Sequence, residues 1–530
     1  METHGSESYF VLNEGLLGES LEGRTRTLAA ALEASTPPFR FSRMGPNGVG
    51  QQLGEANLKK IAKAMTVRAG GGGSQIPAGF TYLGQFIDHD LTFDKTQVML
   101  GENVSPGQLL QARSPSLDLD SLYGAGPQDP ESGKFYSDGV HLKVGETVAA
   151  GSDPAMPGFD LPRVGTGSTK KARRRARIPD KRNDENLAVA QTHLAFIRLH
   201  NRVADSLPAG LTDAQRFARA RELVVKHYQW MIRTDFLPRL CRAAVVNDVF
   251  TNGRKAFEVG VVPTEVPTMP IEFSVAAYRL GHSMVRGVYE WNKNFNTDTG
   301  IPGSLELLFE FSGLSGAMAG DEKLLTSWIA DFRRLYDFNE AGRGDLVVPA
   351  AKFNRARRID TKLAQPLAQL PQQTIGPPPV PDTDPTRNLA FRNLSRARMV
   401  RLATGQQMAR FLKQKGVTLT ALTKAQIRDG KNGALLDMLG RAQRDALLAK
   451  TPLWFYILRE AELNNGKLTG VGARIVAETF HRAMEGSEFS IVRDTSFQPT
   501  LGPNNSTFRM VDLLLFAANN NANMINPLGD

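Results

Sequence analysis

Cysteine is nearly absent from this 530-residue sequence, which contains only Cys241. A single cysteine excludes a disulfide within the chain, so the stability of the fold does not depend on an oxidising compartment. The low cysteine content also favours a bacterial origin.

Segments that would take the chain into or across a membrane are lacking as well. No apolar stretch is long enough to span a bilayer. Residues 1–20 have neither the basic start nor the long apolar core of a secretory signal. These absences leave the localisation open between the cytoplasm and export without a classical signal, and they say nothing about the oligomeric state.

Acidic residues are outnumbered, with 54 Asp and Glu against 64 Lys and Arg, which gives a net charge of +10. Part of the excess lies in residues 170–177, KKARRRAR. Such a run suits nucleic acid or an anionic membrane. No aromatic residues are interleaved to stack on bases, so we favour a solvated loop and expect no nucleic-acid partner.

Long alternating β patterns are scarce, whereas apolar residues recur at helical spacing. We therefore expect a mainly α fold with few short strands and one large domain at residues 81–530. Residues 1–80 are expected to form an N-terminal arm and loops, and residues 365–387 a proline-rich surface connection. The expected helices cover residues 187–203, 213–232, 273–288, 324–336, 388–413, 433–448 and 472–483.

A short helix around residues 82–91 carries a polar face. At about 100° per residue, Gln85, Asp88 and His89 fall on one arc, and Asp90 falls on the opposite, apolar arc. A buried Asp90 needs a cation or hydrogen bonds. A divalent-metal site at Asp88, His89 and Asp90 is one interpretation, although neighbours on a helix point to different sides and do not easily share one ion.

Five segments resemble segments of the animal (myeloperoxidase-type) haem peroxidase family, and they occur in the order that the family has. GQFIDHDLTF at residues 84–93 resembles the distal helix, and residues 178–186 with the helix that follows resemble the segment bearing an arginine and a glutamate. AYRLGHS at 277–283 resembles the proximal helix, and 389–398 the segment behind it. Residues 114–124 resemble the calcium loop.

The resemblance implies haem b buried between a distal and a proximal helix. His282 would bind the iron, with the side chain of Asn393 accepting from its other nitrogen. Arg279 and Arg396 would pair with the haem propionates, because a guanidinium grips a carboxylate with two bonds.

On the distal side, His89 would move the peroxide proton and Arg182 would stabilise developing negative charge. Gln85 would orient a water or an anion. The implied function is a peroxidase that reduces hydrogen peroxide through a ferryl intermediate and oxidises a small organic donor, a halide or a pseudohalide.

Covalent attachment of the haem is also implied. Asp88 and Glu185 occupy the positions that form ester links to haem in the family. Asn186 stands where myeloperoxidase has a methionine that makes a third, sulfonium link, so that link is absent and efficient chloride oxidation is not expected.

The resemblance further implies a calcium ion behind the distal helix, which would provide the cation that Asp90 needs. The implied ligands are all oxygen atoms, as calcium prefers. They are the side chains of Asp90, Ser114, Asp118 and Asp120 and the backbone carbonyl of Ser116.

Two alternatives remain. In fatty-acid dioxygenases of the same superfamily a radical-forming tyrosine stands three residues before the proximal histidine; here that residue is Arg279, and Tyr278 is expected to face elsewhere. The other is a haem-free scaffold or binding protein, which retention of His89, Arg182 and His282 disfavours. His193 and His200, seven residues apart, are expected to be structural.

Overall fold

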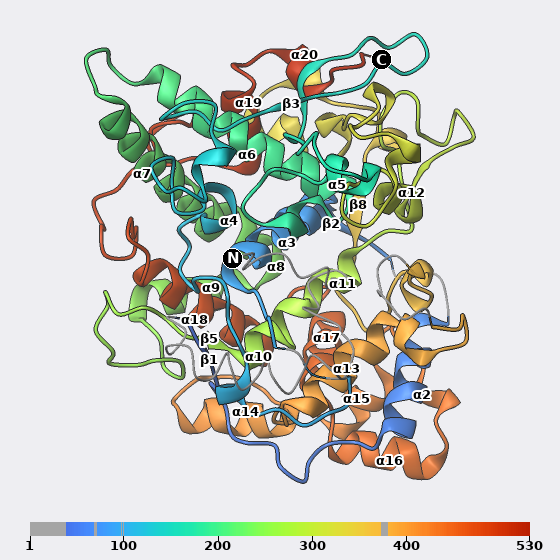
Figure 1. Cartoon of the computed structure of the whole chain (residues 1–530). Helices are drawn as coiled ribbons and strands as arrows, with labels where there is room; N and C mark the ends of the chain where they lie inside the picture. The colour runs from blue at the N-terminus through green and yellow to red at the C-terminus, as the bar shows by residue number, and fades with distance from the viewer. Residues whose placement is uncertain (1–38, 68–71, 97, 99, 373–379, 530) are drawn as a thin grey trace.

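The computed structural model describes residues 39–67, 72–96, 98, 100–372 and 380–529. Within these ranges helices dominate (Figure 1), which confirms the expected mainly α fold. The longer helices are α2 (Glu55–Thr66), α3 (Gly79–Leu91), α6 (Leu187–Ser206), α7 (Asp213–Met231), α9 (Ala243–Asn252), α13 (Leu389–Met399), α14 (Gly405–Gln414), α16 (Arg441–Ala449), α17 (Leu453–Leu463), α18 (Val471–Glu485) and α19 (Met510–Ala517). The shorter ones are α4 (Asp120–Tyr123), α5 (Lys170–Arg174), α8 (Leu237–Leu240), α10 (Ile271–Ser274), α11 (Gly281–Met284), α12 (Leu305–Glu310), α15 (Lys424–Asp429) and α20 (Ala522–Ile525).

Strands are short and pair only two by two. The pairs are β1 (Phe41–Ser42) with β5 (Met269–Pro270), parallel, and three antiparallel pairs, namely β2 (Gly73–Pro77) with β8 (Arg355–Arg357), β3 (Gly145–Glu146) with β4 (Pro157–Asp160), and β6 (Val288–Tyr289) with β7 (Gly303–Ser304). They join segments that are distant in sequence without forming a layer.

Helix α3 lies near the centre of the molecule (Figure 1) and buries every residue except Gly84. Its back packs on α6, where the Phe86 and Phe196 rings stack with centroids 4.4 Å apart. Its first residue must be small, because a Cβ on Gly79 would lie 2.3 Å from the Tyr336 ring. Close packing at both positions fixes where α3 presents its polar side chains.

The segment around His282 is a broken helix, contrary to the continuous helix expected over 273–288. It consists of α10, a 3-10 turn at Ala277–Leu280 and α11, with a break at Ala276 (φ −132°, ψ −68°). The indole of Trp454 in α17 donates to the carbonyl of Arg279 at 3.3 Å. Tertiary packing therefore replaces the regular helical bonds here.

Three other expected helices are interrupted as well. Residues 324–336 form only two 3-10 turns, at Thr326–Trp328 and Phe332–Arg334. The helix expected over 388–413 is divided into α13 and α14, because Thr404 caps the second helix and ends the first pattern. The helix expected over 433–448 is a 3-10 turn at Leu436–Met438 followed by α16.

The N-terminal segment is more structured than the expected arm. Residues 1–38 lie outside the described residues, but α2 buries an apolar face against α13, and Asn388 Nδ2 donates to Thr66 Oγ1 at 2.9 Å. The proline-rich connection is also anchored, since Arg387 donates to the carbonyl of Leu370 at 3.0 Å. Residues 373–379 of that connection lie outside the described residues.

The first five residues of the basic run at 170–177 form a short capped helix, α5, rather than a loop. Thr169 accepts from Ala172 at the start of α5. Arg173 pairs with Glu322 at 2.7 Å, and Arg174 donates to the carbonyl of Ala317 at 3.0 Å. Because these charges are engaged within the chain, the run gives no support to a nucleic-acid site. Among the described residues, no helix is both long and apolar enough to cross a bilayer.

Candidate active site

The histidine of α3 is fully buried and held at one nitrogen only. His89 Nδ1 lies 2.8 Å from Asn183 Oδ1, whereas Nε2 has no hydrogen-bond partner. Burial, and then the charge of Arg182, lower the pKa of His89 to about 3. A neutral imidazole with one unpartnered nitrogen is the state that a proton acceptor requires.

Arg182 is fixed beside this histidine by a buried aspartate, Asp180, that no sequence pattern predicts. Its Nε and Nη2 donate to the Asp180 carboxylate at 3.0 and 2.7 Å, and Nη2 also donates to the carbonyl of His89 at 3.0 Å. The guanidinium lies over the Phe93 ring, 4.4 Å from the centroid. Although burial opposes it, Arg182 and Arg113 lower the pKa of Asp180, so its negative charge holds Arg182 in place.

A chain of polar side chains positions Gln85. Asn186 Nδ2 donates to Gln85 Oε1 at 2.9 Å, and Gln85 Nε2 donates in turn to Glu185 Oε1. Glu185 Oε1 lies 3.8 Å from His89 Nε2, and Glu185 Oε2 has no partner. Burial raises the pKa of Glu185 to about 8, so this carboxyl is protonated at neutral pH. Asn186 also caps α6 through Val189.

His282 lies at the start of α11 with its Nδ1 2.7 Å from the Nδ2 of Asn393. Both side chains are buried, and Asn393 Oδ1 has no hydrogen-bond partner. A half-turn of the amide brings that oxygen onto Nδ1, which gives a protonated Nδ1 an acceptor and leaves Nε2 as a ligand atom. The two side chains are thus in contact, but the amide nitrogen rather than its oxygen faces Nδ1, so the expected acceptor role of Asn393 stays a prediction.

The expected propionate partners line one small cavity together with Arg182. Arg279 donates from Nε to the carbonyl of Ser274 at 2.8 Å, and Arg396 pairs with Asp94 at 2.5 Å. Arg396 thus already has a carboxylate partner from the chain itself. Asp94 occupies the place where a ligand carboxylate would bind.

Asp88 lies between the two sides of the site. Burial raises its pKa to about 6, against the opposing charges of Arg279 and Arg182. Thr92 Oγ1 donates to Asp88 Oδ2 at 3.1 Å. The charge of Arg279, in the His282 segment, thus acts on Asp88 in α3.

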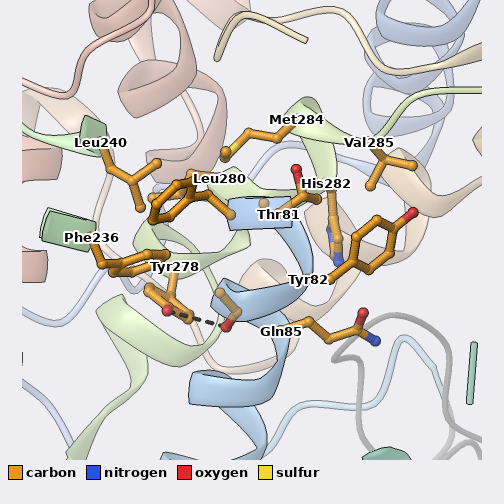
Figure 2. Close-up of a pocket in the computed structure, with 13 residues that line it drawn as sticks. Thr81, Tyr82, Gln85, Phe236, Leu240, Tyr278, Leu280, His282, Met284 and Val285 are labelled. Atoms are coloured by element: carbon orange, nitrogen blue, oxygen red, sulfur yellow. Dashed lines mark hydrogen bonds between the residues drawn. The ribbon is translucent and has the colours of Figure 1, made fainter. Parts of the chain in front are cut away.

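An apolar cavity lies between α3 and the His282 segment (Figure 2). Tyr82, Gln85 and His282 lie at one end, and the lining continues over Phe236 and Tyr278. A π-helical turn at Ile232–Phe236, between α7 and α8, brings Phe236 into this wall.

Tyr278 corrects one expectation. It was expected to face away from the site, but it lines the same cavity as His282, and its hydroxyl donates to the carbonyl of Gly84 at 3.2 Å. The 3-10 turn at Ala277–Leu280 accounts for this, since it shifts side chains from the positions that an α-helix would give them.

The expected calcium loop lies against the other side of α3. Asp90 Oδ2 accepts from Leu119 N at 3.2 Å, and Oδ1 accepts from Ser121 N at 3.3 Å. Burial, then the negative charges of Asp120 and Asp118, raise the pKa of Asp90 to about 8. Nevertheless, in the described part of the chain no three His, Cys, Asp or Glu side chains converge on a common metal position.

The remaining expected ligands of this loop are engaged with protein groups. Ser114 Oγ accepts from Ser116 N at 3.2 Å, and the Ser116 carbonyl accepts from Asp118 N at 3.0 Å. Asp118 Oδ1 accepts from Ser487 Oγ at 2.5 Å. The loop thus lies beside α3, but its carboxylates, all among the described residues, do not converge on a common metal position.

The two histidines of α6 differ in role. His200 bonds Tyr123 at 3.1 Å and the carbonyl of Val140 at 2.9 Å, as a structural residue would. His193, expected to be structural too, lies 2.9 Å from Asn183 and so belongs to the site. Asp180 and Asn183 were missed because an amide and a second aspartate show no periodic pattern; only their adjacency to Arg182 marks them. Asn186 was considered only for the absent sulfonium link, not as a partner of Gln85.

Comparison with known proteins agrees with this geometry. Residues 95–312 match the family model for animal haem peroxidase, a span that includes Arg182, Glu185 and His282 but not His89 or Asn393. A "Peroxidase-like protein" of Margaritifera margaritifera is 28% identical over 197 residues, 35% of this chain and 23% of that protein. The chain spans only about a quarter, or less, of the length of the curated relatives it matches.

Solved structures show the same fold over nearly the whole chain. Peroxidase A from Dictyostelium discoideum has a TM-score of 0.58 and 15% identity, covering 92% of this chain and 94% of its own. The Oryza sativa fatty acid alpha-dioxygenase has a TM-score of 0.52 and 11% identity, covering 89% and 78%. None of these matches bears on the expected bacterial origin.

Proposed function

Because residues 95–312 match the family model for animal haem peroxidase, we propose that this chain is a haem-dependent peroxidase that reduces hydrogen peroxide and oxidises a small donor. One observation carries the proposal. The Nε2 of His89 is buried and unpartnered beside Arg182, on the helix whose Gln85 lines a cavity with His282.

The side chains present fit haem b. His282 would bind the iron through Nε2, with Asn393 orienting the ring from Nδ1. Arg279 and Arg396 would pair with the propionates, and Arg396 would exchange Asp94 for one of them. Bound haem would supply the redox-active iron at which the O–O bond of peroxide is cleaved.

Ester links to haem are supported by the state of two carboxyls. Asp88 and Glu185 are both buried, both have raised pKa values, and both lie on the side of the site that bears His89. We expect haem to remain with the chain on acid–acetone extraction after peroxide turnover. Asn186 bonds Gln85 and caps α6, and it has no sulfur atom for a third link.

The protein's own part in the reaction is proton transfer and charge stabilisation. His89 would take a proton from peroxide at Nε2 and return it to the departing oxygen. Arg182, held by Asp180, would stabilise negative charge on the oxygens. Gln85, held by Glu185 and Asn186, would orient a water or an anion beside them.

Haem binding by purified protein tests the proposal directly. Haem-supplemented wild type should show a Soret band, and His282→Ala should lose it because the iron loses its protein ligand. His481→Ala removes another buried histidine, on α18, and should keep the band. Wild type without a Soret band would instead favour the haem-free scaffold.

Two observations favour the alternative function, a fatty-acid dioxygenase. Tyr278 lines an apolar cavity shared with His282, and the rice dioxygenase has the same fold. Incubation with linoleate and oxygen, without peroxide, distinguishes the two functions. A peroxidase should form little lipid hydroperoxide; rapid formation that disappears in Tyr278→Phe would favour the dioxygenase.

Calcium behind α3 is part of the proposal. It would neutralise Asp90, Asp118 and Asp120, whose mutual repulsion contributes to the raised pKa of Asp90. Metal analysis of the purified protein should find calcium, and chelation should lower the melting temperature. Asp118→Asn should weaken retention of the ion, whereas a wild type free of calcium and insensitive to chelation would contradict this part.

A further inference from the structure

Three buried side chains form an unbranched chain of hydrogen bonds that leads away from the proton-transfer nitrogen. His89 Nδ1 meets Asn183 Oδ1 at 2.8 Å, and Asn183 Nδ2 meets His193 Nδ1 at 2.9 Å. The exposed fraction of all three residues is 0%. The outer nitrogens, His89 Nε2 and His193 Nε2, have no hydrogen-bond partner.

Building on the proposed function, we infer that Asn183 is a positioning residue that sets the tautomer of His89, with His193 fixing the orientation of the Asn183 amide. An amide oxygen only accepts, so a bond to Asn183 Oδ1 requires the proton of His89 on Nδ1. The lone pair is then on Nε2, the nitrogen that would take the peroxide proton.

His193 supplies the reason that the amide does not turn. If Asn183 rotated by half a turn, its Nδ2 would donate to His89 Nδ1 and place the proton on Nε2, which would remove the acceptor. As the amide lies, its Nδ2 faces His193 Nδ1, so that nitrogen carries the lone pair and the proton of His193 is on Nε2. In this tautomer His193 accepts only from Nδ2, and a turned amide would bring its oxygen against the lone pair of Nδ1.

The arrangement also retains the transferred proton. When Nε2 of His89 gains a proton from peroxide, one O–H bond breaks and one N–H bond forms, and the proton on Nδ1 stays where it is. Asn183 is a poor proton acceptor, in contrast to a carboxylate. The proton is thus available at Nε2 for return to the departing oxygen rather than lost along the chain.

A purely structural role is a weaker explanation. A leucine of similar volume would fill the space of Asn183 without the cost of burying an amide between two imidazoles. The amide instead joins two imidazoles whose outer nitrogens, His89 Nε2 and His193 Nε2, have no hydrogen-bond partner, whereas a fold-stabilising network would satisfy them.

The first test reads the tautomers themselves. In full-length protein with ¹⁵N-labelled histidine, before haem is added, His89 should show a protonated Nδ1 and His193 a protonated Nε2. Signals are assigned by their loss in His89→Gln and His193→Gln. A protonated Nε2 on His89 would overturn the inference whether or not the chain is a peroxidase.

The second test uses ligands of the haem-loaded protein. Hydrogen cyanide must give up a proton to bind as cyanide, whereas carbon monoxide needs no proton acceptor. In Asn183→Leu we expect cyanide affinity and the rate of reaction with peroxide to fall by about tenfold or more, with carbon monoxide affinity unchanged. Asn183→Asp keeps an acceptor for Nδ1 and should recover most of the cyanide affinity.

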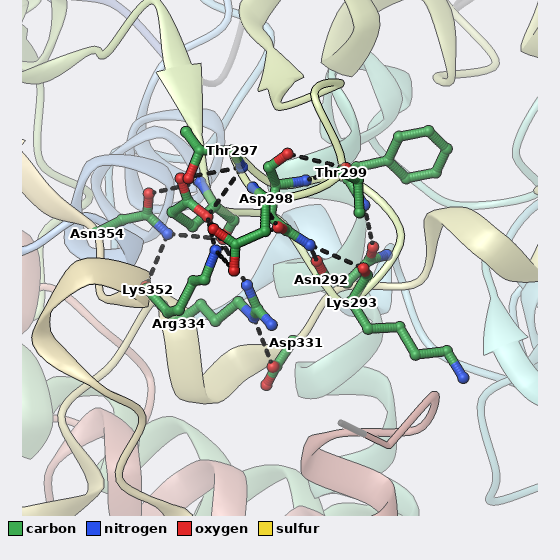
Figure 3. Close-up of polar contacts among 12 residues, drawn as sticks. Asn292, Lys293, Thr297, Asp298, Thr299, Asp331, Arg334, Lys352 and Asn354 are labelled. Atoms are coloured by element: carbon green, nitrogen blue, oxygen red, sulfur yellow. Dashed lines mark hydrogen bonds and ion pairs between the residues drawn. The ribbon is translucent and has the colours of Figure 1, made fainter.

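Asn292→Leu is the matched control. Asn292 is also buried among polar groups (Figure 3), but its amide nitrogen donates to the carbonyls of Ser327 and Ile329 and not to a histidine. It should lose stability and keep wild-type cyanide binding. If wild type reacts with peroxide and the two leucine variants bind cyanide alike, the inference fails while the proposed function stands.

Discussion

At the scale of single residues, the site consists of charged groups held by other charged groups. Arg182 illustrates this, because Asp180 takes two of its donors and Phe93 covers its plane. Sequence alone identified Arg182 through its family-like surroundings. It did not identify Asp180, since a carboxylate two residues away carries no sign of which arginine it holds.

Arg182→Ala should slow the reaction with peroxide by about 100-fold or more while leaving the Soret band intact, because it removes the charge that stabilises the departing oxygen. Stopped-flow absorbance measures this rate. Arg198→Ala removes another guanidinium, half-buried over the Phe159 ring, and should leave the rate near wild type. An unchanged rate in Arg182→Ala would contradict the role given to it.

At the scale of elements, helices with a continuous apolar face were predictable and broken ones were not. α7 and α18 lie within two residues of their expected bounds because their patterns run to a cap or a terminal glycine. The segment over 273–288 shows a helical pattern too, yet tertiary contacts such as the indole of Trp454 break it at Ala276. Such contacts are absent from local sequence.

The position of α3 depends on a close approach at its first residue. Gly79→Ala should lower the free energy of unfolding by about 1 to 3 kcal/mol, because the new methyl overlaps the Tyr336 ring. Urea denaturation measures the change. Gly344→Ala, where the new methyl meets open space, should stay within about 0.5 kcal/mol of wild type; equal losses in both variants would refute the steric reason.

At the scale of the whole molecule, acid stability depends on histidines buried far from one another in sequence. Burial lowers the pKa of His200, His227 and His481 to about 4. Each also uses a ring nitrogen as an acceptor; that of His227 accepts from the backbone N–H of Thr500 and Leu501. Protonation would break these bonds, so the folded chain keeps the rings neutral.

These histidines predict a loss of stability on acidification. The unfolded chain takes up protons below about pH 6.5, whereas the folded chain resists until about pH 4, so the free energy of unfolding is full above 6.5 and falls between these values. Each ring contributes on the order of 1 kcal/mol per pH unit. Urea denaturation from pH 7.5 to 5 should show a shallower slope for His227→Leu, and an identical slope would count against this account.

The state of the single thiol, Cys241, affects how well the protein would resist oxidation by hydrogen peroxide. Cys241 is fully buried, and burial raises its pKa to about 12, so it carries almost no thiolate at neutral pH. Thiolate is the form that peroxide oxidises to sulfenic acid. The one sulfhydryl is thus unreactive toward peroxide, and under the proposed function repeated turnover should not inactivate the protein by sulfur oxidation at this position.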